Sequence, residues 1–158
     1  MVWAEGFKKT LILDVLKKFE GFSATPYYCA GGYKTIGYGH KIRPGENFGP
    51  LSQEQAEILL QKDIKKIEAS VDRLIQVALT DLQKTALISF TFNVGAGALQ
   101  RSTLRAKVNR AEHETVPAEL LKWVYNNGKA LKGLVYRRGI EGNLYHNKIE
   151  FFRIFQDS

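Results

Sequence analysis

The chain has 158 residues, 44% of them hydrophobic and 25% charged, a composition of one globular domain rather than of a disordered or fibrous chain. Its formal net charge is +7, so it attracts polyanions, although charge alone does not choose among nucleic acid, an anionic membrane and acidic cell wall. Cys29 is the only cysteine, which excludes an intramolecular disulfide, and no segment supplies the roughly 20 apolar residues of a membrane span.

The first predicted element is an amphipathic helix over residues 8–20. Apolar side chains recur at helical spacing on one face of it: Ile12, Val15, Leu16 and Phe19. Gly21 follows directly, and glycine is the usual residue for the left-handed conformation that ends a helix. The pattern therefore predicts that Glu20 lies on the last turn of this helix.

Residues 21–50 form the second predicted region, a small β-rich lobe. Glycines and prolines punctuate it, as is typical of tight turns. Between the turns stand β-favouring residues: Tyr27, Tyr28, Tyr33, Ile36 and Tyr38. Short strands joined by tight turns predict a small antiparallel sheet.

A long helix is predicted next, over residues 52–76. Ser52 and Gln55 have the spacing of a capping box at its N-terminus. An apolar stripe continues for about six turns and consists of Ile58, Leu59, Ile64, Ile67, Val71 and Leu74. A helix of this length can join two lobes of one domain.

The remainder, about residues 77–158, is predicted to be a helical lobe to which the helix over 8–20 also belongs. Thr80 with Gln83 resembles a second capping box, and Pro117 suits the first turn of a helix. Segment 93–97 breaks the helical pattern with two glycines. Shorter helices are therefore expected over 80–92, 103–109, 117–127, 134–146 and 150–155.

Glu20 is the first candidate for chemistry. Phe19 and Phe22 flank it, and apolar neighbours disfavour a charged carboxylate, as does the negative end of a helix dipole. A carboxylic acid that keeps its proton near neutral pH is what a general acid needs. The alternative for any single glutamate is an exposed residue that merely ends a helix.

The spacing of two further residues points in the same direction. Eight residues separate Glu20 from Cys29, and five separate Cys29 from Thr35. This order resembles the catalytic pattern of the phage lysozymes, the muramidases of glycoside hydrolase family 24, in which Glu is followed by Asp or Cys and then by Thr at these intervals. The resemblance covers about residues 15–146. Its landmarks are segments 35–40, 92–97, 102–104 and 133–135, together with Trp123, Arg137, Arg138 and Glu141.

The resemblance implies an α+β, lysozyme-like fold, a single domain over residues 1–158 in which the β-rich lobe faces the helical lobe across a cleft. It implies an endolysin or muramidase that hydrolyses the β-1,4 bond between N-acetylmuramic acid and N-acetylglucosamine in bacterial peptidoglycan. It implies inversion of configuration, which needs a water between two groups held roughly 6.5 to 9.5 Å apart. No cofactor and no metal ion are implied.

In that scheme Glu20 protonates the glycosidic oxygen, Cys29 takes the second position, and Thr35 holds the water, since a hydroxyl both donates and accepts. An ordinary thiol has a pKa of about 8.5 and is mostly neutral at pH 7. Cys29 therefore acts as a base only if its pKa is lowered. Otherwise it is a polar holder of the water or an inert packed thiol.

The resemblance also suggests a partner for the acid. The paired arginines fall where the family places one, and Arg138 is expected to pair with Glu20 across the cleft. Such a pair would favour the ionised carboxyl and oppose the effect of burial.

Three residues are expected to contact the sugar, and one histidine is expected to form a structural pair near the site. Tyr38, Asn93 and Ser102 are candidates for contacts with the sugar, and the alternative role of Asn93 and Ser102 is to cap helices. His40 is expected to bind Asp63 on the long helix, as a structural pair and not as a metal ligand.

Two other functions compete with hydrolysis. A lytic transglycosylase cleaves the same bond with one Glu and the 6-hydroxyl of the sugar, which would leave Cys29 and Thr35 without a purpose. A non-catalytic binder of cell wall or nucleic acid would depend on the basic surface, but the sequence holds no nucleic-acid recognition motif.

The expected partner is bacterial peptidoglycan, bound by a monomer without nucleic acid and without stable membrane insertion. No secretory signal is recognisable in the chain. The protein is therefore expected to be made in the cytoplasm of a host cell and to act on periplasmic peptidoglycan. Two routes outward are open, release with the help of a holin and export by a segment removed before residue 1.

Overall fold

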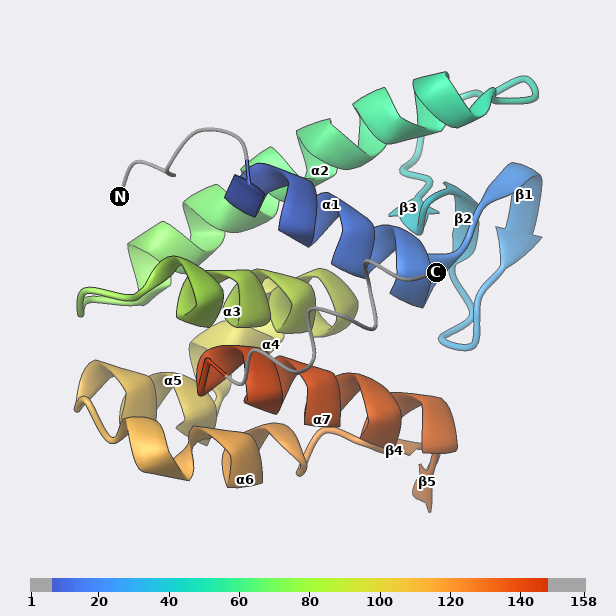
Figure 1. Ribbon diagram of the computed structural model, residues 1–158. Coiled ribbons are helices and arrows are strands. Elements are labelled where there is room, and N and C mark those ends of the chain that lie inside the picture. The colour runs from blue at the N-terminus through green and yellow to red at the C-terminus, as the bar shows by residue number, and fades with distance from the viewer. Residues whose placement is uncertain (1–6, 148–158) are drawn as a thin grey trace.

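Helix α1 (Phe7–Glu20) is the first element of the computed structural model, which describes residues 7–147 and their side chains from Thr10 onward (Figure 1). One face of α1 is buried, through Leu11, Ile12, Val15 and Leu16. The helix ends at Glu20 because Gly21 takes a φ of 67° and its amide donates to the carbonyl of Lys17 over 3.0 Å. The helix predicted over 150–155 lies outside the described residues.

A three-stranded antiparallel sheet follows, in the order β1 (Ser23–Tyr28), β2 (Lys34–Gly37) and β3 (His40–Lys41). The register of β1 against β2 shifts between Ser23 and Tyr27, which bends the edge strand. Strand β2 is buried from Thr35 to Gly37, whereas most of β1 is exposed. The small antiparallel sheet predicted for this region is confirmed.

Helix α2 (Gln53–Leu74) runs from beside the sheet to the opposite end of the molecule (Figure 1). Its predicted capping box is present, because the Gln55 amide donates to the Ser52 hydroxyl over 3.0 Å and the Ser52 amide donates to the Gln55 side chain over 2.9 Å. Within residues 7–147, no helix is long and apolar enough to span a membrane.

Helix α3 (Asp81–Val94) is the centre of the core. Every residue from Lys84 to Thr91 is buried, because α1, α2 and α7 (Lys132–Tyr145) pack around it. Its N-terminus is capped by Thr80 and Gln83 as expected. In Figure 1, α3 lies between α1 above and α7 below, and the sheet lies to one side of these helices.

The break predicted within segment 93–97 is present, because α3 ends at Val94 and Gly95 takes a φ of 94°. The helix that follows it, α4 (Ala96–Arg101), was not predicted. One prediction in the helical lobe is wrong. The helix expected over 117–127 is only α6 (Val116–Leu120), which follows α5 (Thr103–Asn109) and one 3-10 turn, η1 (His113–Thr115).

The chain after α6 forms a hairpin of β4 (Tyr125–Asn126) and β5 (Lys129–Ala130). Asn127 and Gly128, which join the strands, have φ values of 50° and 77°. Two consecutive positive φ values are typical of the tight hairpin turn that an Asn-Gly pair favours. The Asn-Gly pair is therefore a turn signal here, and it does not mark the end of a helix.

Candidate active site

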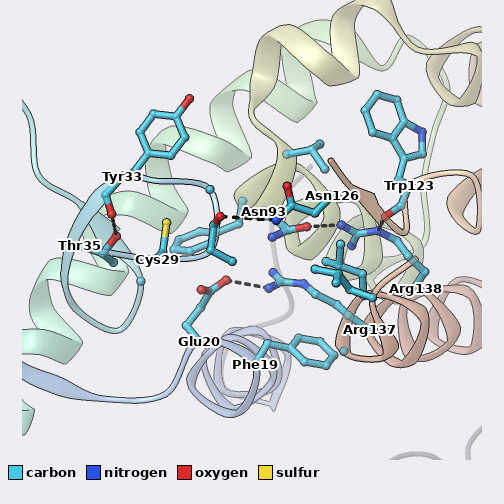
Figure 2. Close-up of a pocket in the computed structure, with 18 of the residues that line it drawn as sticks. Phe19, Glu20, Cys29, Tyr33, Thr35, Asn93, Trp123, Asn126, Arg137 and Arg138 are labelled. Carbon is cyan, nitrogen blue, oxygen red and sulfur yellow. Dashed lines mark hydrogen bonds and ion pairs between the residues drawn. The ribbon is translucent and has the colours of Figure 1, made fainter. Parts of the chain in front are cut away.

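A cleft of about 660 Å³ lies between the sheet and the helical lobe. Its walls come from the end of α1, from β1 to β3, from the end of α3, from the β4–β5 hairpin and from the start of α7. Glu20, Cys29 and Thr35 all line it, and Figure 2 shows them on the same side of the cleft. The fold thus brings together three residues that are separated by loops in the sequence.

Glu20 projects into the cleft from the last turn of α1, with its side chain 18% exposed. Its Oε1 accepts a hydrogen bond from Nη1 of Arg137 over 2.7 Å (Figure 2). The pairing predicted with Arg138 is therefore corrected to Arg137. Neighbouring residues of a helix point about 100° apart, so only one of the two arginines of α7 can face the end of α1.

Arg137 is held in place from several sides. Its Nη2 donates to the Ser89 carbonyl over 2.9 Å, and its guanidinium lies 4.7 Å from the centre of the Phe19 ring. Glu141, which is fully buried, lies 3.4 Å from Nε of Arg137 and accepts from the hydroxyl of Ser89 over 2.6 Å. These contacts fix the cation that faces Glu20.

Arg138 makes a different set of contacts from Arg137, although both line the cleft. It pairs with Glu141 over 2.6 Å, donates to the Trp123 carbonyl over 3.0 Å, and donates to the side-chain oxygen of Asn93. Burial lowers the pKa of Arg138, and the charge of Glu141 opposes that effect. Arg138 therefore anchors Asn93 at the edge of the cleft (Figure 2).

Gly39 brings backbone against the acid. A Cβ atom at this position would lie 2.7 Å from Oε2 of Glu20 and 2.9 Å from its carboxyl carbon. The residue also has a φ of 75°, which glycine adopts without strain. The β2–β3 turn thus borders the carboxyl with a residue that has no side chain.

Cys29 follows β1 directly and is partly buried. Burial raises the pKa of its thiol, but other contacts lower it. These are hydrogen bonds with the Thr35 hydroxyl and with the backbone at Tyr33 and Gly31, and the charge of Lys41. Together they outweigh burial, so the pKa of Cys29 lies below its ordinary value. These contacts favour the thiolate, the form that can accept a proton from water.

Thr35 is buried in β2, and its hydroxyl lies 2.9 Å from the Tyr33 carbonyl, to which it donates. A hydroxyl has one proton and can also accept. While it donates to the carbonyl it can accept from the Cys29 thiol, and it can turn to stabilise the thiolate.

Two tyrosines of the predicted β-rich lobe border the same region, although of the tyrosines only Tyr38 was predicted by number as a site residue. Burial and then the negative charges of Glu20 and Cys29 raise the pKa of Tyr27, which lines the cleft with them. The Tyr33 ring lies 4.4 Å from the ammonium of Lys41. Both rings offer flat, partly exposed faces to the cleft.

Of the three residues predicted to contact the sugar, the structure places only one in the lining of the cleft. Asn93 lines the cleft, but Tyr38 and Ser102 are not among its lining residues. Tyr38 packs against Phe22, with 5.5 Å between ring centres. Ser102 is buried and caps α5, because its hydroxyl accepts from the Arg105 amide over 3.0 Å. The alternative role of Ser102, helix capping, is therefore the one its contacts support.

His40 and Asp63 form the expected pair, with 2.7 Å between Nδ1 and Oδ2. Nε2 of His40 lies 3.1 Å from Glu46 as well. The hydrogen bond with Asp63 raises the pKa of His40, burial opposes it, and the charge of Asp63 and the contact with Glu46 add to the rise. Among residues 7–147, no group of three or more His, Cys, Asp or Glu side chains could hold a metal ion.

The β4–β5 hairpin lines the cleft and contacts the β-rich lobe. The side-chain amide of Asn126 donates over 3.4 Å to the carbonyl of Ala30, in the loop that joins β1 and β2 (Figure 2). The two lobes therefore touch across the cleft. The sequence pattern did not predict this contact, because the Asn-Gly pair was interpreted as the end of a helix.

Comparison with known proteins places this geometry in context. The phage lysozyme family model matches residues 17–141. The endolysin of Bacillus phage B103 is 39% identical over 135 residues, which are 84% of this chain, and the chain spans only 51% of that protein. The endolysin of Acyrthosiphon pisum secondary endosymbiont phage 1 is 38% identical, over 85% of this chain and 94% of its own length.

A solved structure agrees with the fold. The muramidase domain of SpmX from Asticaccaulis excentricus superimposes with a TM-score of 0.76 and 29% identity, over 85% of this chain and 94% of that one. The α+β, lysozyme-like fold expected from the sequence is therefore confirmed.

Proposed function

The chain belongs to the phage lysozyme family, and on that premise we propose that it is an endolysin, a glycoside hydrolase that cleaves bacterial peptidoglycan. The bond cleaved is the β-1,4 linkage between N-acetylmuramic acid and N-acetylglucosamine. The observation that carries the proposal is that a carboxyl, a thiol and a hydroxyl from α1 and the sheet face one cleft opposite the helical lobe. No cofactor takes part in the proposed reaction.

Glu20 is the general acid. It protonates the glycosidic oxygen as the bond to the sugar carbon breaks, and the leaving sugar departs as an alcohol. The contact with Arg137 holds the carboxyl in one orientation, and the bare backbone at Gly39 leaves room beside it.

Cys29 and Thr35 handle the water that attacks from the opposite face of the sugar. Thr35 holds the water by a hydrogen bond, and the water gives a proton to the Cys29 thiolate as its oxygen attacks. Attack from this face inverts the configuration at the sugar carbon. The lowered pKa of Cys29 supports the role of base over that of an inert thiol.

The decisive experiment compares the wild type with Glu20→Gln. We expect the variant to lose clearing of outer-membrane-stripped bacteria by at least about a hundredfold, the usual loss when a general acid is removed, while binding to murein persists. A variant that clears as well as the wild type would refute the assignment. Glu57→Gln is a matched control, because Glu57 is a half-exposed carboxylate that also pairs with a cation, at 2.8 Å, but lies on α2.

The products distinguish hydrolysis from its closest rival. A hydrolase releases reducing N-acetylmuramic ends, whereas a lytic transglycosylase releases anhydro ends. Reducing ends are expected, because Cys29 and Thr35 serve water and have no task in transglycosylation.

The remaining expectations about the protein in the cell are part of the proposal. The enzyme is a monomer made in the cytoplasm of a host cell, and it reaches periplasmic peptidoglycan when a holin releases it. Nucleic acid is not a partner. Sedimentation of the purified chain and fractionation of expressing cells, with and without a holin, test these points.

A further inference from the structure

Two hollows continue the cleft along the side of the sheet. One of about 250 Å³ shares Gly39, Lys41 and Phe92 with the cleft. A larger one of about 600 Å³ shares Arg43, Asp63 and Lys66 with the first. Together they form a groove, here called the α2 groove, that leads from the catalytic cleft past β3 to the outer face of α2.

The carboxylates of this groove already have partners. Asp63 and Glu46 both contact His40, and Glu46 also binds Arg43, whose hydrogen bond lowers the pKa of Glu46 to about 2. The engaged carboxylates are therefore poorly able to neutralise the lysines that line the groove.

Three lysines of α2 supply the uncompensated charge. Lys62, Lys65 and Lys66 are exposed, and within residues 7–147 none of their ammonium groups makes an ion pair or hydrogen bond. Their spacing of three and four residues puts them on one face of α2. Lys41 continues the positive charge to the edge of the cleft.

The floor of the groove is partly apolar. Phe48 and Leu59 line the larger hollow, and Ile67 and Phe92 line the smaller one. Phe48 packs edge-on against His40, with 5.5 Å between ring centres, so it is held in place. A ligand that fits must combine negative charge with short apolar side chains.

We propose that the α2 groove binds the anionic stem peptide that hangs from the glycan strand while the strand occupies the catalytic cleft. The inference rests on the proposed function, and it adds a site for the peptide part of the substrate. The stem peptide offers carboxylates to the lysines of α2 and alanine methyl groups to the apolar floor.

Continuity with the catalytic cleft favours this ligand over a separate polyanion. Gly39 and Lys41 line both the cleft and the start of the groove, so a peptide attached to a sugar in the cleft can reach the groove without detaching from its strand. A phosphate-rich polymer would need no connection to the cleft and no apolar floor. Phosphate binding without a gain in cleavage is therefore a contrary outcome of the test.

The test uses two substrates, soluble uncrosslinked murein strands with their stem peptides and the same strands after an amidase has removed the peptides. The triple variant Lys62→Gln, Lys65→Gln, Lys66→Gln is compared with the wild type by the release of reducing ends. We expect kcat/KM on peptide-bearing strands to fall about tenfold, since three exposed charge contacts combine to roughly that factor. On peptide-free strands, which keep only the lactyl carboxylate of each N-acetylmuramic acid, kcat/KM should change no more than it does in the net-charge control described next.

A second triple variant controls for net charge. Arg73→Gln, Arg101→Gln, Lys129→Gln removes the same charge from exposed positions that do not line the groove. It should change cleavage of both strands by the same factor. The inference fails if the two triple variants behave alike, or if the α2 variant keeps the wild-type preference for peptide-bearing strands. If the wild type cleaves neither strand, the proposed function fails first.

Discussion

At the scale of single residues, the candidate site depends on the close surroundings of two groups, the Glu20 carboxyl and the Cys29 thiol. The Glu20 carboxyl is bordered by the Arg137 guanidinium on one side and by the backbone of Gly39 on the other. The Cys29 thiol is surrounded by a hydroxyl, backbone groups and a lysine. Each of these contacts can be altered by a single substitution.

Gly39→Ala tests the border of the acid. The added methyl group would lie 2.7 Å from Oε2 of Glu20 and must displace the carboxyl, so we expect kcat on murein to fall at least about tenfold, the effect of a small misplacement of a catalytic group. Gly45→Ala is the matched control. Gly45 has a φ of 87°, and no atom lies within 4 Å of the place that its methyl group would take, so both variants carry a similar backbone strain of about 1–2 kcal/mol. Equal activities of the two variants would contradict a role for Gly39 beside Glu20.

The reactivity of Cys29 tests its ionisation. Alkylation by iodoacetamide follows the thiolate, so its pH midpoint should lie below that of an ordinary cysteine, because the pKa of Cys29 is lowered. Thr35→Val removes the hydroxyl and should move the midpoint upward. Complete alkylation of the wild type should abolish murein clearing. Full activity after alkylation would remove Cys29 from the mechanism.

At the scale of elements, helix ends determine which polar residues are available to the substrate. Ser52, Thr80 and Ser102 all accept from the backbone of the helix that they precede. In the helical lobe, one of two predicted substrate contacts lines the cleft and the other caps a helix. Asn93 lies at the end of α3 and lines the cleft, whereas Ser102 is used by α5.

Ser102→Ala tests this division. Loss of the cap should lower the free energy of unfolding by about 1 kcal/mol, while kcat/KM on murein stays within about twofold of the wild type. Chemical denaturation and a murein-clearing assay measure the two effects. Thr103→Ala, at the exposed neighbouring position, is the control for both. A large loss of activity without loss of stability would return Ser102 to the binding site.

At the scale of the whole molecule, the two lobes are joined by α2 and by contacts that cross between elements. His40 of β3 binds Asp63 of α2, and Asn126 reaches the loop between β1 and β2. The first contact depends on charge and is therefore sensitive to pH. The pKa of His40 is raised in the folded state.

Asp63→Asn tests this link. Because the folded pKa of His40 lies above the unfolded value of about 6.5, the stabilisation is complete below pH 6.5 and is lost as the pH rises through the folded pKa. The variant should be less stable by about 1.5–3 kcal/mol below that pH, the range of a hydrogen bond to a charged group. The difference in Tm should shrink toward pH 9. A difference that does not change with pH would contradict a charged His40.

The sequence by itself determined the local structure and the chemical types of the site. Apolar periodicity predicted α1, α2, α3 and α7 nearly to their ends, because a helix buries one face whatever it packs against. The intervals from Glu20 to Cys29 and Thr35, through their resemblance to the phage lysozyme pattern, predicted the candidate reactive groups, since these lie within one short stretch of chain.

Only the tertiary structure decided which side chains face one another across the cleft. The choice of Arg137 over Arg138 depends on the rotation of α7 against α1, and these helices are more than a hundred residues apart in the chain. The positions of Gly39, Asn126 and Tyr38 relative to the cleft depend in the same way on how lobes and turns meet. Periodicity along one segment carries no information about the packing angle between two segments, so these contacts could not be predicted from sequence.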